Sequence, residues 1–268
     1  MSYSQNQIVL ITGAASGLGW ALTQAYVNEG HTVVMADVQE TLLETRVTEL
    51  KGQAVHSMVC DVTKVEEVET VVAYIKETHG RLDALINNAG ITHRSLVEAT
   101  QPSVIRKVMD VDYYGPVQLT MAALPLLKQS KGTIINVSSM AGWMPVLGRA
   151  GYCAAKSALH QFFEVLRCEV RHYGVDVMMV YPSFLDTPIE QNALGGDGKK
   201  ATHKRSMVGR MGTAEGVAKT MLSAHKKGQE RVFPDTFTWL ASVYYKLAPA
   251  AFLRAMTKKF ADELRPVK

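Results

Sequence analysis

The stretch that decides the fold is IVLITGAASGLG, residues 8–19, in which a short apolar run is followed at once by a glycine-rich turn. Residues 8–12 are apolar or β-branched at successive positions, which is typical of a strand covered on both faces. The glycines at 13, 17 and 19 allow a tight turn and a close approach of the backbone to a pyrophosphate, and a helix-like segment begins at Leu18. This order of strand, turn and helix predicts a dinucleotide site at the end of the first strand.

Short apolar runs recur along the chain and alternate with segments of helical period. The runs cover residues 32–37, 54–61, 82–90, 132–139 and 175–182, and the helical segments cover 18–28, 65–78, 104–128 and 152–173. Strands that alternate with helices through right-handed crossovers form a doubly wound parallel sheet with helices on both faces. We therefore expect a single-domain, Rossmann-like α/β fold over residues 1–233, with a flap at 186–212. A C-terminal helical tail at 234–268 is expected to pack on the same domain.

The composition fits one large domain and excludes several other classes of protein. The chain has 268 residues, 47% of them hydrophobic and 20% charged, with a formal net charge of +4, so it is not a disordered chain. No basic face of the kind that binds nucleic acid is evident. The three cysteines lack metal-ligand spacing, which indicates a reduced protein without a metal site. The absence of a basic, then apolar leader and of a run of about 18 apolar residues predicts a cytoplasmic protein.

An aspartate at the end of the second predicted strand bears on the choice of dinucleotide. Asp37 lies 18 residues after Gly19, where a carboxylate can accept hydrogen bonds from the adenosine ribose diol and would repel a 2′-phosphate. The next residue is Val38, not an arginine that could bind such a phosphate. The sequence thus predicts NAD in preference to NADP. The alternative is an aspartate that only caps a turn.

Three residues near the middle of the chain have the chemistry of proton exchange with an alcohol. Tyr152 and Lys156 are four residues apart, so on a helix they share a face, and Ser139 ends the preceding strand. A phenol with a pKa of about 10 is a poor base at neutral pH unless a cation stabilises its phenolate, and Lys156 can supply that cation. Ser139 can hydrogen-bond the substrate oxygen beside Tyr152. A single tyrosine or lysine on a helix more often packs in the core or lies at the surface, so the prediction depends on Ser139, Tyr152 and Lys156 occurring together.

Together these motifs resemble the short-chain dehydrogenase/reductase family of single-domain, NAD-dependent oxidoreductases. The resemblance covers about residues 8–233 and rests on TGAASGLG (12–19), Asp37, Asp61-Val62, NNAG (87–90), INVSS (135–139), YCAAK (152–156) and Pro182 with Thr187, in the family's order. It implies hydride transfer between NAD(H) and a secondary alcohol or ketone. By the same resemblance, Tyr152 is the general acid/base, Lys156 lowers its pKa and binds the nicotinamide ribose, and Ser139 positions the substrate.

The resemblance also implies which residues border the cofactor. This set is Gly13, Ser16, Gly17, Leu18, Gly19, Asp37, Asp61, Val62, Asn88, Ala89, Gly90, Val111, Tyr152, Lys156, Pro182, Leu185 and Thr187. Within it, Asp61 and Val62 would contact the adenine, and Leu185 and Thr187 would reach the nicotinamide amide. Members of the family are generally dimers or tetramers built through their long central helices, so the resemblance implies a homodimer or homotetramer.

One position in the central helix departs from the family pattern. Where the family has an asparagine that supports a water-mediated proton relay to the active-site lysine, this chain has Asp112, in the stretch DVDYYG (110–115). A carboxylate only accepts hydrogen bonds unless it is protonated, whereas an amide also donates. We expect Asp112 to take part in the catalytic site, to hold the Lys156 ammonium more tightly and to shift the pH optimum. The alternative is a near-isostere without consequence.

The sequence leaves the function open at three points. The rival to an alcohol dehydrogenase or carbonyl reductase is a non-catalytic sensor or scaffold that binds a nicotinamide dinucleotide and has no need of the Ser-Tyr-Lys set. No residue identifies the substrate, although the flap and the aromatic tail favour a lipophilic alcohol or ketone. The tail is expected to close over the substrate pocket or pack on another subunit, in preference to resting on a membrane surface. Its aromatic residues include Trp239, Tyr244, Tyr245 and Phe252, next to several lysines and arginines.

Overall fold

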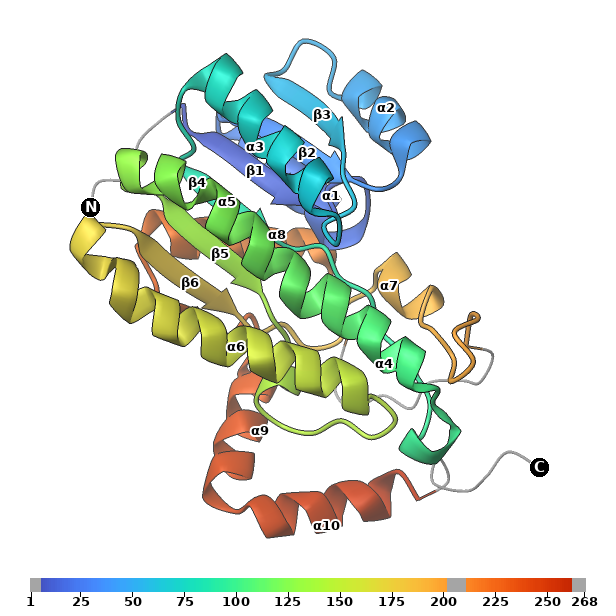
Figure 1. The fold of residues 1–268 in the computed structure, drawn as a ribbon. Helices are drawn as coiled ribbons and strands as arrows, with labels where there is room; N and C mark the ends of the chain where they lie inside the picture. The colour runs from blue at the N-terminus through green and yellow to red at the C-terminus, as the bar shows by residue number, and fades with distance from the viewer. Residues whose placement is uncertain (1–5, 202–210, 262–268) are drawn as a thin grey trace.

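The computed structural model describes residues 6–201 and 211–261. Within these residues, seven parallel strands form one sheet in the order β3-β2-β1-β4-β5-β6-β7. The strands are β1 (Ile8–Thr12), β2 (Thr32–Asp37), β3 (Val55–Val59), β4 (Ala84–Asn87), β5 (Thr133–Val137), β6 (Asp176–Val180) and β7 (Arg231–Val232). The strand order reverses between β1 and β4, and open parallel sheets bind ligands at such a switch point. The predicted doubly wound, Rossmann-like fold is confirmed (Figure 1).

Helices cover both faces of the sheet. They are α1 (Gly17–Asn28), α2 (Glu40–Glu49), α3 (Val65–His79), α4 (Pro102–Met109), α5 (Gly115–Ser130), α6 (Ala150–Val170), α7 (Pro188–Gln191), α8 (Ala214–Lys226), α9 (Thr236–Leu247) and α10 (Pro249–Lys259). In Figure 1, α3, α5 and α6 lie across one face of the sheet, with α1 and α8 behind it. Helices α1 and α2 lie on one face and α3, α5 and α6 on the other, because right-handed crossovers change face where the strand order reverses, between β1 and β4. Helix α8, which joins β6 to β7, lies on the same face as α1.

The core is divided by the sheet into two apolar layers. In β1, Val9 and Ile11 belong to the layer that α1 and α8 complete, whereas Leu10 belongs to the layer beneath α3, α5 and α6. All three side chains are fully buried. Each such side chain contributes roughly 1.5–3 kcal/mol through burial. The unbroken apolar run in β1 is therefore explained by burial on both faces, as the sequence predicted.

The predicted central helix at 104–128 differs from the observed one at its middle. Helices α4 and α5 are joined through a π-helical turn at Asp110–Tyr114, so the chain remains helical but widens for one turn. The wide turn lies within the packed layer, and Asp112 is 0% exposed. Turns of this kind are frequent at functional sites because they redirect a side chain without ending the helix.

The part of the flap that the structure describes is bound to the loop after β4. Leu194 donates to Thr92 O at 2.9 Å and accepts from the Arg94 N–H at 2.7 Å, and Gly196 O accepts from the Gln101 N–H at 2.8 Å. A Cβ at Gly196 would lie 1.9 Å from Ala99 O, so only glycine permits this approach. Residues 202–210 of the predicted flap lie outside the described residues. The described part is thus fixed beside the loop that follows the switch point.

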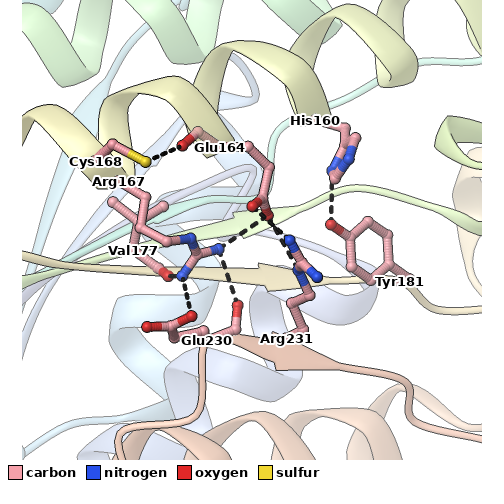
Figure 2. A network of polar contacts seen from close by, with 8 residues as sticks. All are labelled: His160, Glu164, Arg167, Cys168, Val177, Tyr181, Glu230 and Arg231. Atoms are coloured by element: carbon pink, nitrogen blue, oxygen red, sulfur yellow. Dashed lines mark hydrogen bonds and ion pairs between the residues drawn. The ribbon is translucent and has the colours of Figure 1, made fainter.

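A polar network attaches the last strand to α6 and β6 (Figure 2). Glu164 of α6 accepts from Arg167 Nη2 at 3.1 Å and from Arg231 Nη2 of β7 at 2.7 Å. Arg167 also donates to Val177 O in β6 and to Glu230 O, the latter at 3.2 Å. One carboxylate between two guanidinium groups thus fixes the strand from which the tail departs.

The predicted helical tail consists of α9 and α10. Asp235 caps α9 by accepting from the Thr238 N–H at 2.7 Å, and Pro249 opens α10 at the position where proline is favoured. Thr238 is buried at the base of the tail. In Figure 1 both helices extend beyond the α/β body, with α10 running at a steep angle to α9. Among the described residues, no helix combines the length and apolarity needed to cross a bilayer.

Candidate active site

A cavity of about 500 Å³ lies at the carboxyl ends of the strands. Every residue predicted to border a cofactor contributes to its lining except Gly19. Ser139, Tyr152 and Lys156 line the same cavity. Segments that are far apart in the sequence therefore meet at the switch point of the sheet, as the fold requires.

The glycine-rich turn brings the backbone to the cavity wall. Gly13 and Gly17 have φ angles of 64° and 53°, in the left-handed region that favours glycine. A Cβ at Gly19 would lie 2.0 Å from Gly13 O, so this glycine closes the turn against itself instead of facing the cavity. Helix α1 begins at Gly17, and Gly17 and Leu18 line the cavity, so the N-terminus of the helix borders it. Backbone N–H groups and a helix N-terminus together suit an anionic pyrophosphate.

The NNAG segment is tied to this turn by hydrogen bonds. Thr12 Oγ1 accepts from the backbone N–H groups of Asn88 and Ala89, both at 3.0 Å. Asn88 Nδ2 in turn donates to Thr12 O at 2.9 Å. The ends of β1 and β4 are thereby held together, and Asn88, Ala89 and Gly90 form part of the cavity wall.

Asp37 lines the cavity at the end of β2 and is also a local hydrogen-bond acceptor. Its Oδ2 accepts from the Ala15 N–H at 3.0 Å, and its Oδ1 accepts from the Gln39 N–H at 3.1 Å. Arg46 reaches the same turn, where its Nε donates to Ala15 O, but its guanidinium is paired with Glu49 and lies over the Trp20 ring. The carboxylate therefore both caps the turn and presents negative charge at the cavity.

Lys156 lies among the other polar side chains of the site, which are Ser139, Tyr152 and Asp112. Its Nζ donates to Val137 O at 3.1 Å and lies 5.7 Å from the centre of the Tyr152 ring. Tyr152 and Lys156 lie one turn apart near the start of α6, as the spacing predicted. Ser139 follows β5 and accepts from the Ala141 N–H at 3.2 Å, which fixes its hydroxyl next to Tyr152. Three side chains from two segments thus share one wall of the cavity.

Asp112 stands behind Lys156 and does not line the cavity. Its Oδ2 is 3.2 Å from Lys156 Nζ, and its Oδ1 accepts from the Ile91 N–H at 2.8 Å. The π-helical turn makes this approach possible because it carries the carboxylate inward to full burial. The aspartate is therefore an ion-pair partner of the lysine.

The pKa values of the cluster reflect burial first and charge second. Burial raises the pKa of Tyr152 above its usual value, Lys156 opposes this increase, Asp112 adds to it, and a hydrogen bond with Ser139 lowers it. Burial lowers the pKa of Lys156, but Asp112 and Tyr152 outweigh this effect and the net pKa is raised. Burial raises the pKa of Asp112, against the attraction of Lys156. Lys156 therefore carries its charge at neutral pH.

Comparison with known proteins identifies the family. The profile described as "short chain dehydrogenase" matches residues 7–196. The chain belongs to the short-chain dehydrogenase/reductase family. Members of this family are oxidoreductases that act on CH–OH donors with a nicotinamide dinucleotide, so the resemblance inferred from the motifs is confirmed.

Relatives in this short-chain dehydrogenase/reductase family match nearly the whole chain. Dehydrogenase/reductase SDR family member 7B of Xenopus laevis is 35% identical over 96% of this chain and 83% of its own length. An 11-beta-hydroxysteroid dehydrogenase A of Sesamum indicum is 36% identical over 72% of this chain and 57% of its own length. A short chain dehydrogenase of Burkholderia cenocepacia, solved in complex with NADP, has a TM-score of 0.79, 25% identity and coverage of 98% and 99% of the two chains.

In this member of the family, a partly buried ion pair in the lining of the cavity was not predicted from the sequence. Arg149 is 5% exposed, its Nη2 lies 2.8 Å from Glu190 Oε2 of α7, and its Nη1 donates to Thr92 Oγ1 at 2.7 Å. Arg94 Nη2 also donates to Glu190 O at 3.1 Å. Arg149, Thr92 and Glu190 all line the cavity. The one sequence signal was the place of Arg149, three residues before Tyr152.

Proposed function

We propose that this oxidoreductase transfers a hydride between NAD(H) and a secondary alcohol or ketone, with Tyr152, Ser139 and Lys156 as the proton-exchange site. The observation that carries the proposal is the meeting of the glycine-rich turn and these three side chains in one cavity of about 500 Å³. A cavity of this size accommodates a small-molecule ligand. A protein that only senses a dinucleotide has no need of a tyrosine with a buried lysine beside it in the cavity.

The residues present suit a nicotinamide dinucleotide. A Cβ at Gly13 would lie 2.9 Å from Ala89 Cα, and one at Gly17 would lie 3.2 Å from Thr187 Cβ, so a side chain at either position would push the turn away from the segments that line the cavity with it. The α1 N-terminus and Ser16 would hold the pyrophosphate, Asp37 the adenosine ribose, Asp61 and Val62 the adenine, and Lys156 the second ribose. The cofactor, when bound, supplies or accepts the hydride.

Side chains of this protein exchange the proton of the substrate hydroxyl. Tyr152 exchanges the proton of the substrate hydroxyl, and Ser139 hydrogen-bonds the same substrate oxygen. The Lys156 ammonium stabilises the phenolate of Tyr152 by charge, which offsets the cost of burying that anion. Asp112 acts through Lys156 as a positioning residue, because it contacts the lysine and not the cavity.

Asp37 supports NAD over NADP as the cofactor of this chain. Its carboxylate is held at the cavity wall by two backbone N–H groups, and a 2′-phosphate beside it would meet negative charge. Arg46, the cation that reaches this turn, is already paired with Glu49. The Burkholderia cenocepacia relative was solved with NADP, so the test compares both cofactors directly.

The substrate we propose is lipophilic with a polar group near the reacting carbon. Met140, Val146, Phe184 and Ile189 contribute apolar surface to the cavity beyond the catalytic residues. The ion pair of Arg149 and Glu190 lies in the same lining and offers a localised polar contact. Apolar lining with a few placed polar groups is the usual design of a small-molecule site.

A spectrophotometric screen of NAD and NADP with a panel of lipophilic secondary alcohols and ketones tests the proposal. We expect turnover with NAD that falls at least about a thousandfold in Tyr152→Phe, which removes the exchangeable proton. Tyr74→Phe is the matched control, because Tyr74 bonds His56 on the opposite part of the molecule, and it should keep full activity. Binding of NAD without turnover of any substrate would favour the sensor instead, and faster turnover with NADP would overturn the cofactor assignment.

A further inference from the structure

The tail combines exposed apolar surface with positive charge. Among the described residues, the exposed leucine, phenylalanine and tryptophan side chains all belong to the tail. They are Phe237, Trp239, Leu240, Leu247 and Leu253, and Tyr244 is exposed beside them. Contiguous exposed apolar surface on a folded protein marks an interaction site.

On α9 four of the exposed residues form one stripe, and Trp239 lies to one side of it. Phe237, Leu240, Tyr244 and Leu247 are separated by three or four residues, so they lie along one side of the helix. Leu240 is 55% exposed and Leu247 is 79% exposed. We call these four residues the α9 stripe. No residue of α9 or α10 lines the cavity among the described residues, so the stripe is not a cover for the substrate.

Helix α10 is amphipathic and is fixed to α9 by aromatic contacts. Phe252, Met256 and Phe260 recur every four residues on one side, and Arg254 and Lys258 lie on another. The Phe252 ring lies 5.7 Å from the Tyr244 ring and 5.2 Å from the Tyr245 ring, edge-on to both. The two helices therefore form one unit that projects from the body (Figure 1).

The charge of this unit is of one sign. From Thr236 to Ala261 the sequence has four basic residues, Lys246, Arg254, Lys258 and Lys259, and no acidic residue. In the described part of the chain, none of the four has an acidic group within ion-pair distance. Over the whole predicted tail, residues 234–268, six basic residues stand against three acidic ones, so the tail contributes +3 to the formal net charge of +4.

We propose that α9 and α10 dock the protein on the surface of an anionic lipid bilayer. The α9 stripe, which includes Tyr244, enters the interface, Trp239 lies at the headgroup level, and the cations of α10 contact lipid phosphates. A second copy of this chain is a poorer partner for the tail, because its body, residues 1–233, has a formal net charge of only +1 and its own tail is positive. Anionic lipid matches both the apolar stripe and the unpaired cations. The proposal does not depend on the cofactor or the substrate.

Co-sedimentation of the full chain with lipid vesicles tests this docking. We expect binding to vesicles of phosphatidylcholine with phosphatidylserine, weaker binding to phosphatidylcholine alone, and loss of binding at high salt. Leu240→Gln with Leu247→Gln should reduce partitioning at least about tenfold, because two exposed apolar side chains leave the interface. Arg254→Gln with Lys258→Gln should reduce it by a similar factor, since each cation near an anionic surface contributes about fivefold.

Matched controls separate docking from other effects of the substitutions. Val65→Gln and the pair Lys51→Gln with Lys76→Gln change exposed residues on the body and should leave partitioning unchanged. Turnover of a water-soluble alcohol and the molar mass from light scattering should be unaffected in all variants. Equal partitioning of tail and control variants would overturn the proposal. A lower molar mass in the tail variants would overturn it as well, because the stripe would then bind a second copy.

Discussion

The two ends of the cavity are built in different ways. The cofactor end consists mainly of backbone, with glycines at 13, 17 and 19 and local hydrogen bonds between the ends of β1 and β4. The substrate end consists of side chains from distant segments, and its Arg149–Glu190 pair joins residues 41 positions apart. Backbone geometry tolerates few substitutions, whereas a side-chain wall can change without loss of the fold. Under the proposed function, we expect the first end to determine which cofactor binds and the second to determine which substrate binds.

A substitution at Gly19 is expected to have the largest effect at the cofactor end. In Gly19→Ala the new Cβ would lie 2.0 Å from Gly13 O, so the turn must open. We expect NAD affinity to fall roughly a hundredfold or more, measured by calorimetric titration, because displaced N–H groups no longer converge on the pyrophosphate.

Gly52→Asn serves as the control for Gly19→Ala. Gly52 has a positive φ but no atom within 4 Å of the position of a Cβ, and asparagine tolerates this conformation. This variant should bind NAD as the unmodified protein does. Unchanged affinity in Gly19→Ala would mean that the turn does not hold the cofactor.

At the substrate end, Glu190→Gln should act on substrate binding more than on chemistry. The substitution removes the anion that pairs with buried Arg149, while the backbone bonds of the flap to Thr92 and Arg94 remain. We expect KM for the substrate to rise about tenfold and kcat to stay within about threefold. NAD affinity should change less than KM for the substrate, because neither Arg149 nor Glu190 is among the residues expected to border the cofactor.

Glu49→Gln is the matched control for the Glu190 variant. It removes the partner of a partly exposed arginine, Arg46, and should leave KM unchanged. Steady-state kinetics of both variants give the comparison. A fall in kcat at constant KM would assign the Arg149–Glu190 pair to the chemical step instead.

Asp112→Asn should have the smallest effect on the maximal rate. We expect its effect in the pH dependence of turnover. The Asp112 carboxylate raises the pKa of Tyr152, so an amide at this position should lower it. Tyr152 would then lose its proton at lower pH, and the rising limb of the pH–rate profile for alcohol oxidation should move toward lower pH. Asp110→Asn, two residues away and outside the ion pair, is the control. Superimposable profiles for Asp112→Asn and the unmodified protein would refute the positioning role.

The cofactor end was readable in the sequence because its determinants are local. Glycines follow a strand directly, and Tyr152 and Lys156 share a helix face by their spacing alone. The predicted strands ran a few residues too long, as at 82–90 against Ala84–Asn87, because the residues that leave the sheet toward the cavity are still small or apolar. The hydrophobic pattern predicted which segments form strands. It did not predict where each strand ends, because the ends depend on tertiary contacts.

The substrate end and the tail were less accessible to sequence reasoning. Arg149, Thr92 and Glu190 have no mutual spacing that indicates contact, and only the tertiary fold brings them together. The π-helical turn leaves the helical period of 104–128 almost unchanged, so it has no clear sequence signal. Periodicity predicted the tail helices, but it could not show that the α9 stripe faces away from the body.

The shortness of β7 has a consequence for the solubility of the sheet. An edge strand presents unpaired N–H and C=O groups that can recruit a strand of another chain. Strand β7 is only two residues long, Arg231–Val232, and Arg231 is held by Glu164 of α6. An incoming strand would find too few backbone groups in line to form a stable ladder. The shortness of β7 thereby protects this edge of the sheet from fibril-like growth.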